Sequence, residues 1–194
     1  LLLLSNKNFV VFPICASLAF SGLMAYYVIG PFLYQNIIGL SPVQYGWLGL
    51  AIGGAIILGS YVNSRLVVYF QAETLMLASA FTLMMAGILM LIPGMFGVIN
   101  IPVLLIPMFI YVMGMALTYG NAFSSALSSL TSGFGIATAT YSTVQLIGAS
   151  AANTLAALVH VRNQTPIALI LTGLGAIYVM IMLLRWWHWR RAQK

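Results

Sequence analysis

Six long apolar stretches follow one another along this chain, separated by short groups of polar, glycine and proline residues. A helix that crosses a membrane needs about 20 apolar residues, and each stretch is near that length. The stretches are uniformly apolar and do not alternate as the strands of a membrane barrel do. The pattern therefore predicts an all-α integral membrane protein whose six transmembrane helices form one bundle, a single domain over 1–194. The expected spans are 9–35, 42–64, 74–92, 101–119, 134–159 and 166–187.

The breaks between the stretches contain residues that begin or bend helices. The segment SPVQ at 41–44 predicts a capping box with proline at the first helical position. Asn100 and Thr165, each followed closely by a proline, predict two further helix starts. Pro31, after a glycine, should weaken or kink the first helix. The serine-rich stretch 122–133 is expected to be a loop or a short interfacial helix.

The composition excludes a soluble fold. Hydrophobic residues make up 62% of the chain and charged residues 4%, with a mean hydropathy of +1.07. Soluble domains carry roughly 25% charged residues. The net charge of +6 comes from seven basic residues against one acid, and the basic residues lie at the ends of apolar segments. We therefore assign this charge to orientation in the lipid bilayer and expect no binding of nucleic acid.

Charge also predicts the topology. Six crossings put both termini on one side of the membrane, together with the second-to-third and fourth-to-fifth connections. Only Arg162 lies opposite, so the positive-inside rule places both termini in the cytoplasm. The chain begins with Leu rather than Met, which suggests a fragment or a processed chain. The basic residues that share the cytoplasmic side are Lys7, Arg65, Arg185, Arg190, Arg191 and Lys194.

The residues needed for most chemistry are scarce. Two His, one Cys and one acid cannot build a convincing metal site, and no phosphate-binding glycine motif is present. We therefore expect neither an enzyme nor a bound cofactor or metal. No ionisable acid or base lies in the middle of a span, although ion-coupled transport usually needs one there. Any proton-coupling residue should lie outside these 194 residues.

Polar side chains concentrate on the first and fifth spans, while the third and sixth are expected to be peripheral. Gln145 lies near the middle of the fifth span and should face protein or water, since it would be costly in lipid. It could bond a neighbouring helix or line a cavity, and the sequence leaves both open. The pairs Gly49/Gly53 and Gly148/Ala152 have the spacing that lets helices pack closely.

Three stretches resemble one transporter family: SGLMAYYVIGPFLYQ, SPVQYGWLGLAIGGAIILGSYVNSRL and FGIATATYSTVQLIGA. The chain looks like the C-terminal six helices of the major facilitator superfamily, and within it the Bcr/CflA-type drug–proton antiporters. The resemblance implies two six-helix halves that rock around a central cavity. An N-terminal six-helix half would then be the partner of this chain in the inner membrane.

The family's cytoplasmic loop motif is partly matched by Gly59, Asn63 and Arg65, with Asn in place of the family's acid. The surrounding stretch 59–73 is expected to form the turn between the second and third helices. A weak ion pair between Arg65 and Glu73 is possible there.

By this resemblance the chain is half of a multidrug efflux antiporter that lines part of a cavity for lipophilic or cationic drugs. Aromatic rings suit flat or cationic ligands, and methionine adapts to varied shapes. One alternative keeps the fold and transports a sugar, an amino acid or another metabolite. Another is a self-contained six-helix scaffold or channel. The expected substrate contacts are Tyr26, Tyr27, Tyr111, Tyr141 and Gln145.

Overall fold

The computed structural model describes residues 7–128, 130, 132–158 and 162–192, and within them every regular element is helical. Five helices, all but α6, are long and apolar enough to cross a membrane. The predicted six-helix membrane bundle is therefore confirmed, and the chain is a multi-pass membrane protein. The elements are α2 (Lys7–Pro31), η1 (Phe32–Ile37, a π-helix), α3 (Pro42–Leu66), α4 (Ala72–Met95), α5 (Ile101–Leu127), α6 (Phe134–Ala157) and α7 (Thr165–Ala192).

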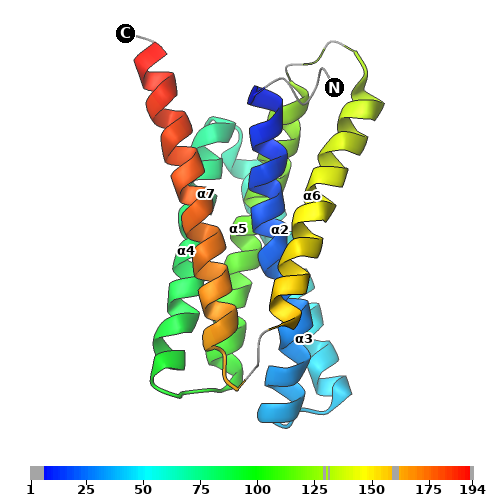
Figure 1. The fold of residues 1–194 in the computed structure, drawn as a ribbon, viewed down its shortest axis with the longest axis vertical. Helices are drawn as coiled ribbons and strands as arrows, with labels where there is room; N and C mark the ends of the chain where they lie inside the picture. The colour runs from blue at the N-terminus through cyan, green and yellow to red at the C-terminus, as the bar shows by residue number, and fades with distance from the viewer. Residues whose placement is uncertain (1–6, 129, 131, 159–161, 193–194) are drawn as a thin grey trace.

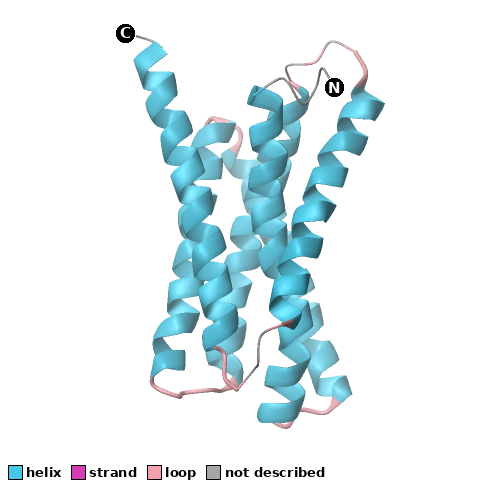
Figure 2. Cartoon of the chain, in the orientation of Figure 1, coloured by secondary structure: helices cyan, strands magenta, loops and turns pink. Residues whose placement is uncertain are grey.

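The helices run up and down along the long axis of the molecule (Figure 1). The first turn of α2 and the last turn of α7 lie at the same end, which is also where α3 turns into α4. Short loops join the helices at both ends, as Figure 2 shows. This alternation is what six consecutive crossings require.

Glycines bring α4 and α7 close together. A Cβ added at Gly87 would lie 2.5 Å from the backbone nitrogen of Thr172, and one added at Gly175 would lie 2.6 Å from the Cα of Met84. Small residues at such positions let backbones approach, which drives helix association where lipid supplies no hydrophobic effect. Neither helix supplies a lining residue to the pocket described below.

A buried hydroxyl cluster joins the same two helices to α5. The Ser79 and Thr118 hydroxyl oxygens lie 2.8 Å apart, and the Tyr178 hydroxyl donates to Thr118 Oγ1 at 3.3 Å. All three side chains are fully buried. The cluster satisfies polar groups that would otherwise be costly in an apolar interior.

The two predicted small-residue pairs behave differently. Gly148 on α6 lies directly against Ser17 of α2, so a close approach at this site is confirmed. Gly49 and Gly53 on α3 have no atom within 4 Å of where a Cβ would stand. Within the described part of the chain, a Cβ at either glycine of that second pair would face open space.

The helix ends follow the local sequence in two of three cases. At α3 the Ser41 amide donates to Gln44 Oε1 at 2.9 Å and the Gln44 amide donates to Ser41 Oγ at 3.2 Å, which completes the capping box. Asn100 Oδ1 likewise accepts the Val103 amide at 3.0 Å. The prediction for Thr165 was wrong: it is already helical, and Asn163 Oδ1 accepts its amide at 3.0 Å.

Two helices differ from the expected course. The chain stays helical through Pro31 and continues as the π-helix η1, which begins directly after this proline, a residue with no amide hydrogen to donate. α5 continues past Tyr119 to Leu127, so the first half of the serine-rich stretch is helix and not a loop.

Candidate functional site

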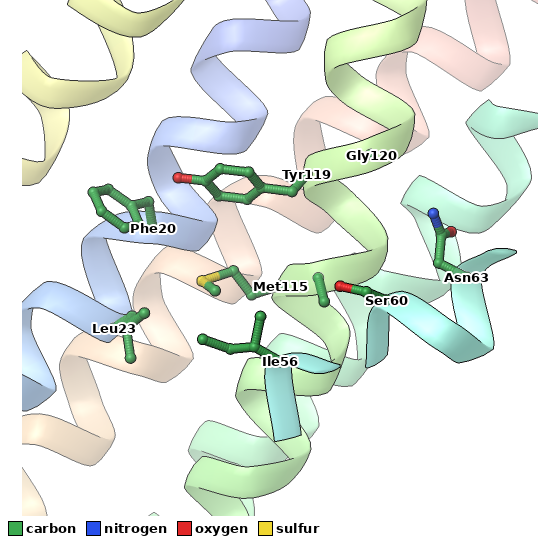
Figure 3. A pocket seen from close by; sticks show the side chains of 9 residues that line it. Phe20, Leu23, Ile56, Ser60, Asn63, Met115, Tyr119 and Gly120 are labelled. Carbon is green, nitrogen blue, oxygen red and sulfur yellow. The ribbon is translucent and has the colours of Figure 1, made fainter. Parts of the chain in front are cut away.

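A pocket of about 370 Å³ lies between α2, α3 and α5. This volume falls within the range of roughly 300–1,000 Å³ in which small-molecule sites are found. Phe20 and Leu23 come from α2; Ile56, Ser60 and Asn63 from α3; and Met115, Ala116, Tyr119 and Gly120 from α5. Figure 3 shows these side chains around the space between the three helices.

Most of the pocket wall is apolar or aromatic. The rings of Phe20 and Tyr119 meet edge to face, with centroids 5.9 Å apart and planes at 66°. Such pairs are favourable because the positive ring edge meets the negative face. Leu23, Ile56 and Met115 complete this side of the pocket. The wall suits a flat apolar body.

Helical spacing explains why α3 contributes Ile56, Ser60 and Asn63. Residues three and four apart share one helix face, so these positions line up along the side of α3 that faces α5. Met115 and Tyr119 have the same relation on α5. The two faces meet because Gly59 has no side chain: a Cβ there would lie 2.8 Å from the carbonyl oxygen of Met113.

Polar groups lie along two sides of the pocket. Tyr119 extends its hydroxyl toward α6, where it accepts a hydrogen bond from Gln145 Nε2. On the other side, Asn121 Nδ2 donates to Asn63 Oδ1 at 2.7 Å and to the Leu117 carbonyl at 2.8 Å. The Ser60 hydroxyl has no partner among the described residues. These groups can orient a bound molecule, whereas the apolar wall supplies most of the contact.

The residues that partly match the family's loop motif, Gly59, Asn63 and Arg65, lie on α3 itself. Gly59 and Asn63 belong to its last eight residues, so the expectation that 59–73 is a turn holds only for residues 67–71, between α3 and α4. Gly59 and Asn63 bind α3 to α5, as described above. Arg65 instead donates to the Tyr61 hydroxyl at 3.0 Å, with its guanidinium 5.2 Å from the Tyr61 ring centroid.

The suggested ion pair between Arg65 and Glu73 is wrong. Glu73 Oε1 accepts from Arg185 Nε at 3.0 Å and from Arg185 Nη2 at 2.9 Å. The guanidinium of Arg185 also lies 4.6 Å from the ring centroid of Phe12. This arrangement joins the start of α4 to α7 and α2, a contact between segments that no local sequence pattern indicates.

The predicted substrate contacts do not gather at this pocket. Tyr26 is buried and donates to the Tyr34 hydroxyl at 3.1 Å. Tyr111 is fully buried between helices and donates to the Ala19 carbonyl at 3.1 Å. Tyr27 is 42% exposed and lies beside Tyr26.

The two predicted contacts on α6 lie closer to the pocket. The Tyr141 ring packs against Phe123, and its buried hydroxyl has no partner among the described residues. Gln145 reaches the pocket through the Tyr119 hydroxyl. The role of all five residues in substrate contact stays a prediction.

Sequence analysis did not select Tyr119, Met115 or Ser60 as lining residues. Their spacing along α3 and α5 is a detectable signal, but it does not reveal which of several faces meets another helix. Polar content pointed to the first and fifth spans, which are α2 and α6, as the helices that line a cavity. The pocket is instead formed by α2, α3 and α5.

No protein-family model matches this chain. The chain is 27% identical over 181 residues to Multidrug resistance protein D of Escherichia coli (strain K12). The match covers 93% of this chain and 45% of that protein, so the chain spans about half the length of this relative. The similarity supports a relationship to membrane transporters of the major facilitator type, in agreement with the resemblance seen in the sequence.

Proposed function

We propose that this chain is the C-terminal six-helix half of a Bcr/CflA-type multidrug efflux transporter and not an enzyme. It would export lipophilic or cationic drugs across the inner membrane by proton antiport. The observation that carries the proposal is the similarity to a multidrug resistance protein over nearly the whole chain. The pocket between α2, α3 and α5 would supply part of the drug cavity.

The chemistry of the pocket supports a lipophilic cargo. Its lining includes two aromatic rings, a methionine and three aliphatic side chains, with one hydroxyl and one carboxamide on α3. A sugar or another strongly polar metabolite needs many hydrogen-bonding partners, because each of its unpaired polar groups would be costly to desolvate. This pocket favours drugs over the metabolite alternative.

Two parts of the proposal concern what lies beyond this chain. The partner would be an N-terminal six-helix half, which the length of the relative accommodates. That half would also carry the proton-coupling acid, because the one acid here, Glu73, is at the start of α4 and paired with Arg185. Both termini would lie in the cytoplasm, since the basic residues gather at that end.

The test is drug transport by the whole gene product that contains this chain. It would be expressed in a bacterium lacking its main efflux pumps, with minimal inhibitory concentrations measured for a drug panel. Everted vesicles would then show whether uptake of a fluorescent drug needs a proton gradient. We expect raised resistance that Tyr27→Ala and Gln145→Ala lower, while Tyr69→Ala, at an exposed turn, leaves it unchanged. Wild-type resistance equal to the empty vector would refute the proposal.

A further inference from the structure

A second pocket, of about 140 Å³, lies between the start of α4 and the last turns of α7. Its lining includes the ion pair between Glu73, the only acid of the chain, and Arg185. Because one charge of each sign lies in the wall, the pocket attracts a zwitterion more than a lone anion or a lone cation. The wall thus favours a ligand that carries both charges.

One oxygen of the Glu73 carboxylate remains for a ligand. Arg185 Nε and Nη2 both donate to Glu73 Oε1, at 3.0 and 2.9 Å. Glu73 Oε2 accepts no hydrogen bond from the part of the chain that the structure describes, and the Glu73 side chain is 35% exposed. A carboxylate oxygen only accepts, so a ligand must bring a donor, and a cationic donor gives the stronger bond.

The first turn of α4 offers hydrogen-bond donors to an anion. Its N-cap residue, Gln71, makes no side-chain cap hydrogen bond, so that side chain does not cover the first amides of the helix. The helix dipole makes this end of α4 positive. The Thr74 hydroxyl is exposed, lines the pocket and can also donate. Donors for a phosphate and an acceptor for an ammonium group therefore lie in one small pocket.

The surroundings of the pocket indicate a lipid headgroup. Leu77 lines the pocket one turn before Phe81, where a row of exposed apolar side chains begins along α4. A second row on α7 ends at Trp186, which also lines the pocket. Acyl chains pack along such rows, and tryptophan is enriched at the level of the headgroups. The rows are Phe81, Met85, Leu89 and Ile92 on α4, and Met180, Leu183 and Trp186 on α7.

We propose that this pocket binds the headgroup of a phospholipid with a primary ammonium group, phosphatidylethanolamine. The ammonium donates to Glu73 Oε2, the phosphate accepts from the Thr74 hydroxyl and the first turn of α4, and the acyl chains follow the two apolar rows. A choline headgroup has no N–H to donate and a glycerol headgroup has no positive charge, so both bind more weakly. The site is separate from the proposed drug cavity, and the inference does not depend on efflux.

The test is native mass spectrometry of the purified whole gene product, stripped of lipid and titrated with one phospholipid at a time. Phosphatidylethanolamine, phosphatidylcholine and phosphatidylglycerol with identical acyl chains isolate the effect of the headgroup. Glu73→Gln keeps the size of the side chain and removes its charge, and its control, Arg65→Gln, removes a charge on α3 outside the pocket lining. Thr74→Val leaves the ion pair intact, and Thr143→Val on α6 is its control.

We expect the first lipid bound by the wild type to be phosphatidylethanolamine, about tenfold tighter than the other two, the effect of one charge-assisted hydrogen bond. Glu73→Gln should abolish this preference. Thr74→Val should weaken binding of all three lipids, because each carries the phosphate, and both controls should behave as the wild type. Equal affinities in the wild type, a preference that survives Glu73→Gln, equal losses in Arg65→Gln, or unchanged binding by Thr74→Val would overturn the inference.

A soluble competitor separates a lipid from a free ligand of the same chemistry. O-phosphoethanolamine has the same charged groups without acyl chains. We expect it to leave the bound lipid in place at millimolar concentration, because the acyl chains supply much of the binding through burial of apolar surface. Displacement of the lipid at that concentration would overturn the assignment to a phospholipid.

Discussion

Replacing Gly59 by alanine tests how tightly α3 packs on α5. The added Cβ would lie 2.8 Å from the Met113 carbonyl oxygen and 2.9 Å from both the Met113 Cα and the Ala116 Cβ. Carbon atoms pack best at about 3.5–4.0 Å, so the two helices would have to separate. Two of the three contacted atoms belong to the backbone, which cannot move aside by changing a rotamer. Overpacking of this kind costs about 1–3 kcal/mol.

A matched control lies on the same helix. Gly53→Ala makes the same chemical change where no atom lies within 4 Å. Alanine favours a helix over glycine by about 1 kcal/mol, and this gain is shared by both variants. The difference between their free energies of unfolding therefore isolates the packing cost. We expect Gly59→Ala to be less stable than Gly53→Ala by about 1–3 kcal/mol.

The assay is unfolding of the purified protein in mixed micelles with increasing sodium dodecyl sulfate, followed by far-ultraviolet circular dichroism. The free energy of unfolding of Gly53→Ala should equal or exceed that of the wild type. Gly59→Ala should also lengthen the hydrogen bond between Asn121 and Asn63, since the added methyl group separates α3 from α5. If the two variants unfold within about 0.5 kcal/mol of each other, the close α3–α5 contact does not exist as described.

Three further substitutions test single contacts in the same unfolding assay. Glu73→Gln should lower the free energy of unfolding by no more than about 1 kcal/mol, because the Glu73 and Arg185 side chains remain 35% and 21% exposed. If the substitution lowers it equally in 1 M salt, the contact is not ionic. Tyr178→Phe should cost about 0.6 kcal/mol, a typical value for hydrogen bonds between membrane helices, and an unchanged midpoint would mean that its hydroxyl bond is not formed. Ser41→Ala should cost about 1 kcal/mol by removing the cap of α3, whereas Ser64→Ala, near the other end, should cost less.

Local sequence determined the elements of this protein. Composition and the length of the apolar stretches were enough to predict six membrane helices, because a bilayer allows few other ways of pairing the backbone. The helix starts after Ser41 and Asn100 followed from capping chemistry, which involves only neighbouring residues. The start of α7 was misplaced because two polar residues, Asn163 and Thr165, lie two positions apart and could each have capped it.

Tertiary structure decided which faces meet. Gly59 contacts α5 while Gly53, on the same helix, faces open space, and nothing in the spacing of the two glycines separates these outcomes. Glu73 pairs with Arg185, 112 positions away, and not with the nearby Arg65. The pocket needs residues from three helices, and Asn121 on α5 orients the Asn63 amide on α3. Such contacts depend on the relative rotation of packed helices, which a pattern along one helix does not contain.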